Sequence, residues 1–477
     1  MCVVTPMSSA DDLEPGGKTT MEGTNLYGNL NNLLNEFPDG MYQSMCLNLK
    51  NLFLSRPGCA FMTLATLCAG CELALPVFDI FAMLMGLHFG VSFEVLHCFS
   101  CERDRKLQTW IREHFNPLYI FPDVTQIYLP LAFDILSQRL QPVDSPDVAV
   151  CGWSCVDNSA ANVNRAKKRR VIEQRDPTSE TSRTAWGLLL FMETKRPRVV
   201  IGENTVDSTT RDEENNPSNL EFFVHQAGLI GYLVFTLFLH ALRFCAPHDR
   251  KRMYIVAFAV ETLTNVSLTR SLQDAAETFA RTVILPTKQL CDYMLADDDP
   301  RVRRWLAWMK QSTVGDRRSS TQTKWHTKHK RFMEQHGYDW PQEPPEAHRA
   351  TLEQLRGFLG ERVYDLLVCL YTIDSPRWSG GEVVVQTLHS IDRSRPKSDA
   401  APCLMPCGFP YAMKRGRPFT PEECYLLQDF DLDASSINIC TFDQGDLTYR
   451  DHMRAAGNAF NGTCLGLALM LAWAHST

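Results

Sequence analysis

Short apolar runs and longer helical patterns alternate along the first half of the chain. The run FMTLATL at 61–67 leads into a glycine turn at Gly70, and apolar positions at helical spacing follow over 75–81. Comparable apolar runs begin further along, at Phe93, Tyr119 and Val148. Strands that are separated by helices pair in parallel and are covered on both faces. The alternation therefore predicts an α/β fold with a mainly parallel sheet.

Two segments fall outside this alternation. Residues 1–57 are polar and carry one helical pattern, over 42–54, so we interpret them as a polar extension. The most apolar segment of the chain runs from Ala227 to Ala246 and contains His240 and Arg243. Because these polar side chains interrupt the segment, we predict a buried helix there and not a membrane span.

Length and composition set outer limits on the function. The chain has 477 residues, 44% of them hydrophobic and 22% charged, which is typical of globular proteins and long enough for two or three domains. The formal net charge of −7 gives no overall attraction for nucleic acid, so such binding would need a local basic surface. No early basic and apolar run resembles a secretory signal, and we interpret the 17 cysteines as reduced thiols of an intracellular protein.

Two cysteine pairs have the spacing of zinc ligands. Cys68 with Cys71 and Cys98 with Cys101 each leave a gap of two residues. Each pair lies where a predicted strand ends, and no second pair follows at the spacing of a zinc ribbon or finger. We therefore predict no metal site.

Residues that can carry chemistry gather where predicted strands end. Cys155 follows the apolar run 148–150 and the turn residue Gly152. Ligands collect at this end of the strands in open α/β sheets, and a cysteine there can act as a nucleophile if its surroundings favour the thiolate. A single cysteine is, however, most often a small buried hydrophobic residue. Glu102 and Asp123 end two other strands, where a carboxylate can bind the hydroxyls of a ribose or simply be solvated.

Basic residues cluster in two regions. The segment AKKRRV at 166–171 lies in a stretch with the composition of a loop, and its cations would bind phosphates, face solvent or serve as a nuclear-import signal. Over 301–331, basic residues are interleaved with Trp305, Trp308 and Trp325, which suits a surface that follows phosphates, while a solvated amphipathic helix explains 301–310 as well. The candidate nucleic-acid contacts are Lys167, Lys168, Arg169, Arg170, Arg301, Arg303, Arg304, Lys324 and Lys328.

Several short sequence blocks occur in a fixed order. They are TLCAG at 66–70, GWSC at 152–155, IGENT at 201–205, PHDRKR at 247–252, RPFTPEECYLLQDF at 417–430 and AAGNAFNG at 455–462. In order and spacing these blocks resemble those of the DNA cytosine-5 methyltransferases, from about residue 58 to the C-terminus. Ser159, four residues after Cys155, is similar to the serine that trails the family's catalytic cysteine and is a further candidate contact to nucleic acid.

The resemblance implies a Rossmann-like sheet of the S-adenosylmethionine-dependent methyltransferases with a smaller target-recognition domain inserted into it. We expect a catalytic domain over 58–266, completed by 445–477, and a target-recognition domain with a junction over 267–444, after the extension 1–57. The implied cofactor is S-adenosyl-L-methionine. Its expected contacts are Leu67, Cys68, Gly70, Glu102, Asp123 and Asn458.

The family's reaction assigns roles to four residues. Cys155 would add to C6 of a flipped-out cytosine, Glu203 would hydrogen-bond N3 and the exocyclic amine, and Arg252 would bind O2, with Arg250 as the second conserved arginine. The resemblance thus implies methylation of cytosine C5 in DNA without a metal. We expect duplex DNA as the partner, a monomer that does not enter a membrane, and a nuclear location if the source is eukaryotic.

The chain departs from the family pattern at several positions. Those positions are Cys68, where the family has an aromatic ring, Glu72 and Leu73 for paired glycines, Ser154 for proline, Val156 for glutamine and His248 for glutamine. A cytosine-5 methyltransferase of RNA and a catalytically silent relative that binds nucleic acid are the alternative functions.

Overall fold

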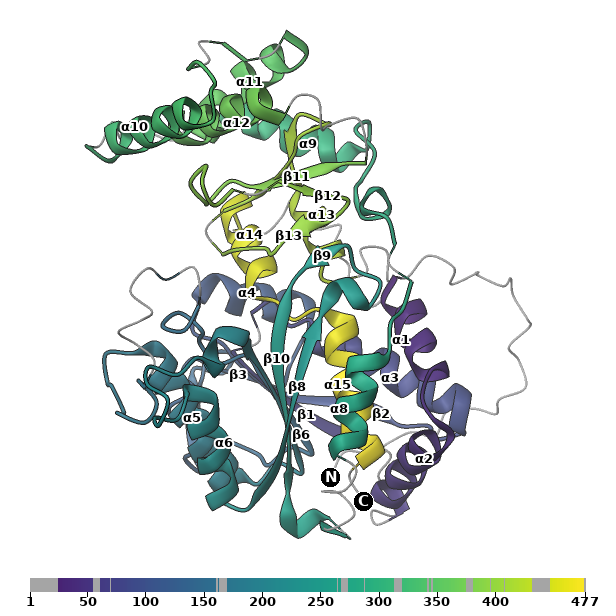
Figure 1. Cartoon of the computed structure of the whole chain (residues 1–477). Coiled ribbons are helices and arrows are strands. Elements are labelled where there is room, and N and C mark those ends of the chain that lie inside the picture. Colours follow the sequence, from purple (N-terminus) through teal and green to yellow (C-terminus); the bar gives the residue numbers. More distant parts are fainter. Residues whose placement is uncertain are drawn as a thin grey trace.

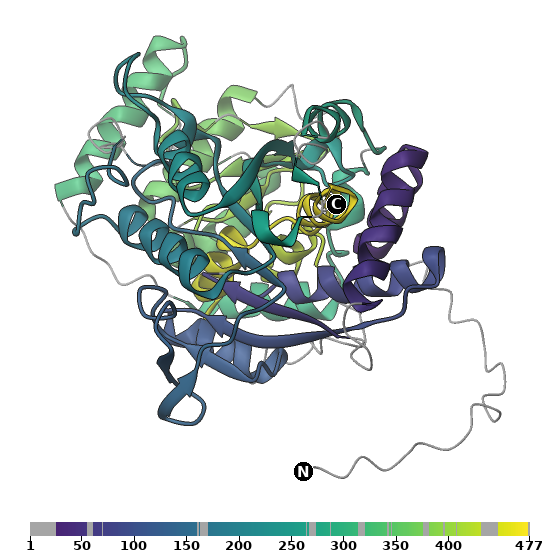
Figure 2. The ribbon, with the colours of Figure 1, turned by 90° about the horizontal axis from the view of Figure 1, so that it is seen from below.

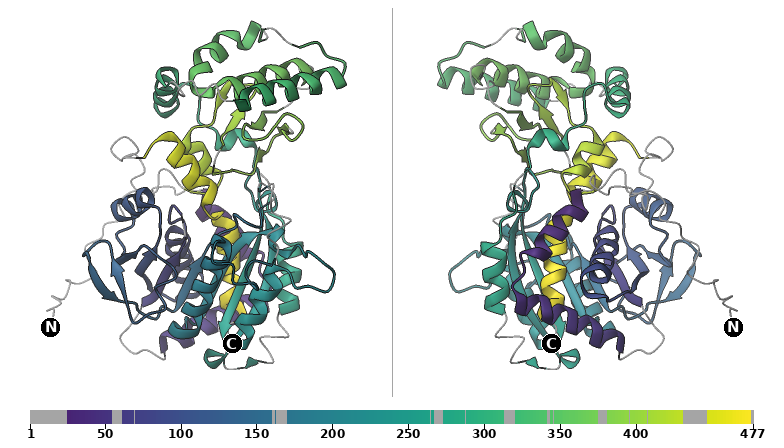
Figure 3. Two further views of the ribbon diagram at one scale, coloured as in Figure 1. Left: turned by 90° about the vertical axis from the view of Figure 1, so that its left-hand side faces the viewer. Right: turned by 90° about the vertical axis from the view of Figure 1, so that its right-hand side faces the viewer.

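The computed structural model describes residues 25–54, 61–68, 70–159, 162, 170–263, 265–266, 273–286, 288–312, 320–340, 343–344, 346–374, 381–394, 396–406, 408–430 and 447–475. Two units lie one above the other (Figures 1 and 3). The larger unit is built on a seven-stranded sheet, and the smaller one on a four-stranded sheet.

The seven-stranded sheet confirms the predicted mainly parallel arrangement. Its strands are, in spatial order, β3 (Tyr119–Phe121), β2 (Glu94–Cys101), β1 (Phe61–Leu67), β6 (Val148–Cys151), β7 (Val199–Thr205), β10 (Lys251–Ala259) and β8 (Tyr232–His240). The first five are parallel, while β10 is antiparallel to both of its neighbours. A small hairpin, β4 (Leu131–Asp134) with β5 (Arg139–Pro142), follows β3.

Helices cover both faces of this sheet, as the alternation of strands and helices predicts. One face packs against α1 (Asn25–Asn35), α2 (Asp39–Leu54), α3 (Ala74–Phe89), α8 (Gln273–Thr282) and α15 (Gly462–His475). The other face packs against α5 (Glu180–Lys195) and α6 (Asn219–Leu229). Further along, α4 (Arg105–His114) lies where the larger unit meets the smaller one.

The prediction of a buried helix over 227–246 is wrong. The segment contains the end of α6, a turn at Gly231 with φ of +86°, and the edge strand β8. Its aromatic and β-branched residues favour a strand. Buried Phe235, Leu237 and Leu239 alternate with the half-exposed Phe238, which is the period of two expected for a strand with one covered face. A continuous apolar run does not by itself distinguish the two states.

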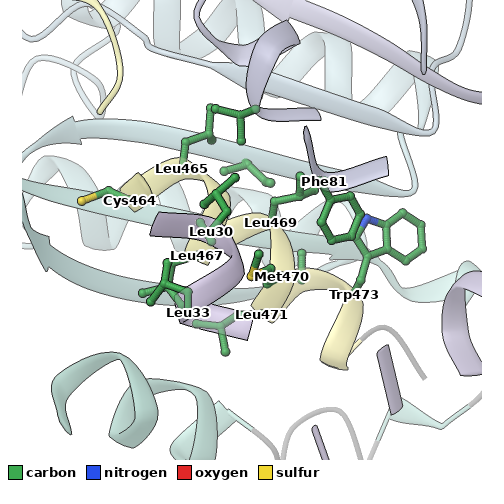
Figure 4. Packing of buried hydrophobic residues seen from close by; sticks show 14 of the residues in the cluster. Leu30, Leu33, Phe81, Cys464, Leu465, Leu467, Leu469, Met470, Leu471 and Trp473 are labelled. Carbon is green, nitrogen blue, oxygen red and sulfur yellow. The ribbon is translucent and has the colours of Figure 1, made fainter. Parts of the chain in front are cut away.

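Residues 25–54 also differ from the expected polar extension, because they form two helices that pack against the rest of the protein. Helices α1 and α2 pack against α15, which is buried along its whole length (Figure 2, where α15 is seen nearly end-on, and Figure 4). A Cβ atom at Gly466 would lie 2.2 Å from the side chain of Leu30, so these helices approach closely. Among the described residues, the helical stretch Tyr449–His475 is long and apolar enough to cross a membrane, but 94% of its apolar window is buried inside the protein.

The smaller unit stands over the end of the sheet at which the parallel strands finish (Figure 1). Its strands are β12 (Lys397–Ser398), β11 (Val383–Gln386), β14 (Pro410–Ala412) and β15 (Arg417–Pro418). Its helices are α9 (Pro300–Gln311), α10 (Ser320–Gln335), α11 (Glu346–Leu359), α12 (Glu361–Asp374), α13 (Pro421–Leu426) and α14 (Tyr449–Asn458). The amphipathic helix that was one of the two interpretations of 301–310 is present as α9. A short parallel pair, β9 (His248–Asp249) with β13 (Ala401–Pro402), joins the two units.

Candidate active site

A pocket of about 240 Å³ opens at the carboxyl ends of the parallel strands. The loops after β1, β2, β3 and β6, the start of α5, the strand β7, the start of β10 and the end of α14 contribute its walls. Nine of the predicted catalytic and cofactor residues line it: Cys68, Gly70, Glu102, Asp123, Cys155, Glu203, Arg250, Arg252 and Asn458. The tenth, Leu67, is completely buried at the end of β1 and does not line the pocket.

The turn after β1 has an unusual backbone. Cys68, Gly70 and Glu72 have φ angles of +54°, +64° and +64°. A Cβ atom at Gly70 would lie 3.4 Å from the Cβ of Asn458, so glycine keeps this wall of the pocket open. The backbone N–H of Cys68 donates to the carbonyl of Cys101 at 2.8 Å, which ties the turn to β2.

The side chain of Glu72 points away from the pocket. It is completely buried, and its Oε2 accepts hydrogen bonds from the hydroxyls of Ser100 at 2.7 Å and Thr66 at 2.9 Å. His97 Nε2 lies 3.9 Å from Oε1. Burial raises the pKa of Glu72 to about 7, although the two hydroxyl donors oppose the rise. Burial also lowers the pKa of His97 to about 4, so this imidazole is neutral at physiological pH.

Two acids face the pocket beyond this turn. Glu102 accepts a hydrogen bond from the backbone N–H of Asp104 at 2.8 Å, and burial raises its pKa to about 7. Asp123 accepts from the N–H and hydroxyl of Thr125 at 2.9 and 2.8 Å. These carboxylates lie directly after β2 and β3, and both face the pocket as the family resemblance implies for contacts to S-adenosyl-L-methionine.

Cys155 lies in the loop between β6 and α5. Thr184 of α5 accepts a hydrogen bond from the N–H of Ser154 at 3.0 Å, which holds the loop against the helix. The carbonyl of Cys155 accepts from the N–H of Ser159 at 2.9 Å and so closes a tight turn. Burial raises the pKa of the Cys155 thiol, and the guanidinium of Arg252 opposes this rise.

Glu203 and the two arginines form a buried ion-pair cluster beside Cys155. Glu203 Oε1 lies 3.2 Å from Nη2 of Arg250 and 3.0 Å from Nε of Arg252. Because both contacts use Oε1, Oε2 is left for a ligand in the pocket. Arg250 also donates to the carbonyls of Gly457 at 3.2 Å and Ala459 at 2.6 Å, so it links the connection between β9 and β10 to the end of α14. The side chains of these three charged residues are between 2% and 15% exposed.

The basic residues predicted to touch nucleic acid have varied surroundings. Lys167, Lys168 and Arg169 lie outside the described residues. Arg170, Arg301, Arg304 and Lys328 pair with Glu173, Asp299, Glu422 and Asp392 respectively. The side chains of Arg303 and Lys324 are exposed and form no hydrogen bond or ion pair within the described part of the chain. None of the six that the structure describes lines the pocket.

The tryptophans of this region are not equivalent either. Trp305 is buried and donates to Glu422 at 3.1 Å, so it belongs to the core of the smaller unit. Trp308 is 41% exposed. The partly exposed Trp325 has the cations of Lys328 and Arg362 over its ring. Trp308 and Trp325 therefore offer accessible ring surface, and Trp305 does not.

Sequence reasoning missed three residues around the pocket. Arg183 lines it at the start of α5, and its exposed guanidinium contacts no side chain in the described ranges. Arg454 of α14 forms an ion pair with Asp104 at 2.8 Å across the pocket mouth. Cys403, behind Arg252, accepts a hydrogen bond from its Nη2 at 3.5 Å. Of the three, Arg454 directly precedes the block at 455–462, so its place beside that block could have pointed to it, whereas Arg183 and Cys403 reach the site through tertiary contacts.

Among the described residues, all thirteen cysteines are free, and no group of three or more His, Cys, Asp or Glu side chains could hold a metal ion. The site therefore consists of a thiol, an acid with two arginines, and a neighbouring acidic pocket.

A parallel sheet with an acidic pocket at its carboxyl edge and a cysteine beside a Glu–Arg–Arg cluster defines an α/β enzyme of the Rossmann-like methyltransferase class. Residues 75–463 match the model of the family described as C-5 cytosine-specific DNA methylase. The chain belongs to this family, which confirms the resemblance drawn from its sequence blocks.

Two curated relatives carry the name DNA (cytosine-5-)-methyltransferase DMT5. The protein from Cryptococcus neoformans var. grubii is 26% identical over 443 residues, and that from Verticillium dahliae is 24% identical over 486 residues. These alignments cover 86% and 87% of this chain but only 17% and 19% of the two relatives. The chain thus spans less than a fifth of their length.

Solved structures with a similar fold include two methyltransferases. One is the Dnmt2 methyltransferase of S. pombe, with a TM-score of 0.47 and 12% identity, covering 86% of this chain and 98% of that one. The other is a putative DNA modification methyltransferase from an E. coli prophage, with a TM-score of 0.45, 12% identity and the same coverage of both chains.

Proposed function

We propose that this protein transfers a methyl group from S-adenosyl-L-methionine to C5 of a cytosine in DNA, by way of a covalent adduct between Cys155 and C6. The observation that carries the proposal is the convergence of Cys155, Glu203, Arg250 and Arg252 on one pocket. Family membership supports the chemistry, and the names of the two relatives support DNA as the substrate.

The pocket fits the proposed cofactor. Gly70 leaves space that a Cβ atom would take against Asn458, and Glu102 and Asp123 present carboxylates to that space. Carboxylates accept hydrogen bonds from ribose hydroxyls and balance the positive charge of a sulfonium and an ammonium group. When bound, S-adenosyl-L-methionine supplies an electrophilic methyl group. Cys68 lines the pocket without offering an aromatic surface for the adenine.

The residues around Cys155 suit addition to a cytosine ring. The Cys155 thiolate forms a bond to C6, and the electrons of the C5=C6 bond move toward C5, N3 and O2. Glu203, protonated or sharing a proton, donates to N3 and accepts from the exocyclic amine through its available oxygen, while Arg252 stabilises O2. After C5 has gained its methyl group, loss of the C5 proton to a base or water restores the double bond and expels Cys155.

The cytosine must leave the helical stack to reach this buried thiol. Flipping a base costs a few kcal/mol, which contacts to phosphates offset. The exposed cations Arg183, Arg303 and Lys324 are available for such contacts. A nuclear location in a eukaryotic source and a monomeric state remain parts of the proposal.

The experiment that tests the proposal measures transfer of a labelled methyl group from S-adenosyl-L-methionine to unmethylated duplex DNA. We expect incorporation by the unmodified protein and none by Cys155→Ser. Transfer RNA is offered in a parallel reaction, and incorporation into RNA alone would refute DNA as the substrate. Protein that binds DNA but not the cofactor in calorimetry would instead be a catalytically silent relative.

A further inference from the structure

The short strand β9, which immediately precedes Arg250 and Arg252, is held by a segment of the smaller unit. We call residues 401–404, which comprise β13 and the two residues after it, the junction segment. The N–H of Ala401 donates to the carbonyl of Pro247 at 2.7 Å, and β13 pairs with β9 immediately before Arg250. The N–H of Leu404 donates to Nε2 of His248 at 3.1 Å.

His248 is suited to be a fixed acceptor in this contact. It is completely buried, and burial lowers its pKa well below the usual value, so the ring is neutral. A neutral ring that accepts at Nε2 carries its proton on Nδ1. On the other side of the junction segment, the Gln386 amide of β11 donates to the carbonyl of Cys403 at 3.3 Å. The backbone of Cys403 is therefore tied to both units of the protein.

The thiol of Cys403 contacts Arg252 from behind the pocket. Nη2 of Arg252 donates to Cys403 Sγ at 3.5 Å. Its other two nitrogens have different partners within the described residues: Nη1 donates to the carbonyl of Lys251 at 2.8 Å, and Nε lies 3.0 Å from Glu203 Oε1. The Cys403 thiol donates in turn to the carbonyl of Leu404 at 3.6 Å. Arg252 lines the pocket and Cys403 does not.

A thiol is a weak hydrogen-bond acceptor, which matters for this position. It can orient Nη2 in the absence of a substrate and give it up to a stronger acceptor, such as a ring carbonyl oxygen. A carboxylate at the same place would compete with that oxygen for the cation. The sulfur thus orients the guanidinium without preventing Nη2 from donating to the substrate later.

We propose that Cys403 is a positioning residue, through which the junction segment sets the orientation of Arg252 toward the substrate base. This proposal rests on the function proposed above, because it assigns the role of Arg252 to the cytosine. It makes the smaller unit part of the catalytic geometry as well as a surface for DNA. If DNA binding displaced the junction segment, the Cys403 contact would change the orientation of Arg252 as well.

The test compares Cys403→Ala, which removes the acceptor, with Cys403→Ser, which restores one. We expect the alanine variant to lower kcat for DNA methylation by about 10-fold to 100-fold, with an unchanged KM for S-adenosyl-L-methionine, and the serine variant to recover most of the rate. Cys291→Ala, which changes an exposed cysteine in the same unit, is the matched control. A kcat for the alanine variant within twofold of the unmodified protein would refute the proposal.

A second measurement does not depend on methylation. Arg252 lowers the pKa of Cys155, so a displaced guanidinium should shift the pH midpoint of Cys155 alkylation by iodoacetamide to higher pH. The site of alkylation is read by peptide mass spectrometry, and an unchanged midpoint in Cys403→Ala would contradict the positioning role. A shifted midpoint in a protein that methylates no DNA would refute the proposed function and leave the positioning role in place. If Cys403→Ala unfolds at a clearly lower temperature than the unmodified protein, Cys403→Val replaces it. Valine fills the volume of the cysteine side chain but offers no hydrogen-bond acceptor.

Discussion

Glu72→Gln should stabilise the protein at alkaline pH and much less at acidic pH. The wild-type carboxyl is completely buried, and its hydrogen-bond donors among the described residues are the hydroxyls of Thr66 and Ser100. Glutamine keeps the shape of the side chain and an oxygen for both hydroxyls. It also places an amide near His97, whose imidazole is neutral above about pH 4. The substitution therefore removes a buried charge without removing its surroundings.

The pKa of Glu72 gives the size and sign of this effect. A pKa of about 7 in the folded protein, against 4.5 in the unfolded chain, corresponds to about 3 kcal/mol. Because the folded state binds this proton more tightly, the free energy of unfolding falls as pH rises from 4.5 to 7, and the cost is complete above pH 7. At pH 5 most of the cost is absent. The gain from Glu72→Gln should thus be about 2 kcal/mol larger at pH 8 than at pH 5.

Urea unfolding of both proteins at pH 5 and pH 8 measures this difference. Glu94→Gln, at an exposed position at the start of β2, is the control and should show no such dependence on pH. In the folded protein His97 and Cys71 do not titrate between these pH values, since burial lowers the pKa of the former to about 4 and raises that of the latter to about 12. Titration of His97 in the unfolded chain is common to both proteins and cancels in their difference. Equal destabilisation by Glu72→Gln at both pH values would show that the carboxylate is stabilised in the fold and would refute the reasoning.

Three other substitutions test separate parts of the site. Gly70→Ala should weaken binding of S-adenosyl-L-methionine about tenfold in calorimetry, because φ is +64° and the added Cβ narrows the pocket. The control is Gly90→Ala, which has a similar φ and open space around it and should leave the affinity unchanged. Arg183→Gln should weaken DNA binding and reduce its salt slope by about one, and an unaltered slope would argue against a phosphate contact. Arg250→Met should lower the free energy of unfolding by about 3 kcal/mol, since Glu203 loses a buried partner, and a loss below about 1 kcal/mol in urea unfolding would contradict this.

The parallel strands and the residues at their ends could be predicted from the sequence. Apolar runs of strand length that end in Cys155, Glu102 or Asp123 contain both the secondary structure and its polar boundary in a few consecutive residues. Parallel pairing then brings these boundaries to one edge of the sheet, wherever the strands lie in the sequence. For this reason Cys68, Gly70, Glu102, Asp123, Cys155 and Glu203 line a single pocket. Arg250, Arg252 and Asn458, which line it as well, lie on the antiparallel side of the sheet or on α14 and were predicted from the family blocks alone.

Features that depend on distant partners could not be predicted in this way. Arg304 pairs with Glu422, 118 residues away. The basic residues around Arg304 in the sequence therefore do not show that its guanidinium forms an ion pair. Cys403 reaches Arg252 from 151 residues away. The prediction of a helix over 227–246 was wrong for a different reason, since a continuous apolar run is compatible with a strand or a helix until its neighbours in the fold are known.

The two substitutions in the cofactor turn have different consequences for the pocket. Cys68 and Glu72 both adopt the positive φ that glycine adopts most easily, which costs a residue with a Cβ roughly 1–2 kcal/mol. At Glu72 the side chain turns into the core beneath the sheet and is anchored there, so the family's glycine can be replaced without placing a charge against the cofactor. At Cys68 the side chain remains in the pocket wall, and the ring that the family offers to the adenine is replaced by a thiol. If S-adenosyl-L-methionine binds as proposed, we expect hydrogen bonds to Asp123 to contribute more than stacking to recognition of the adenine.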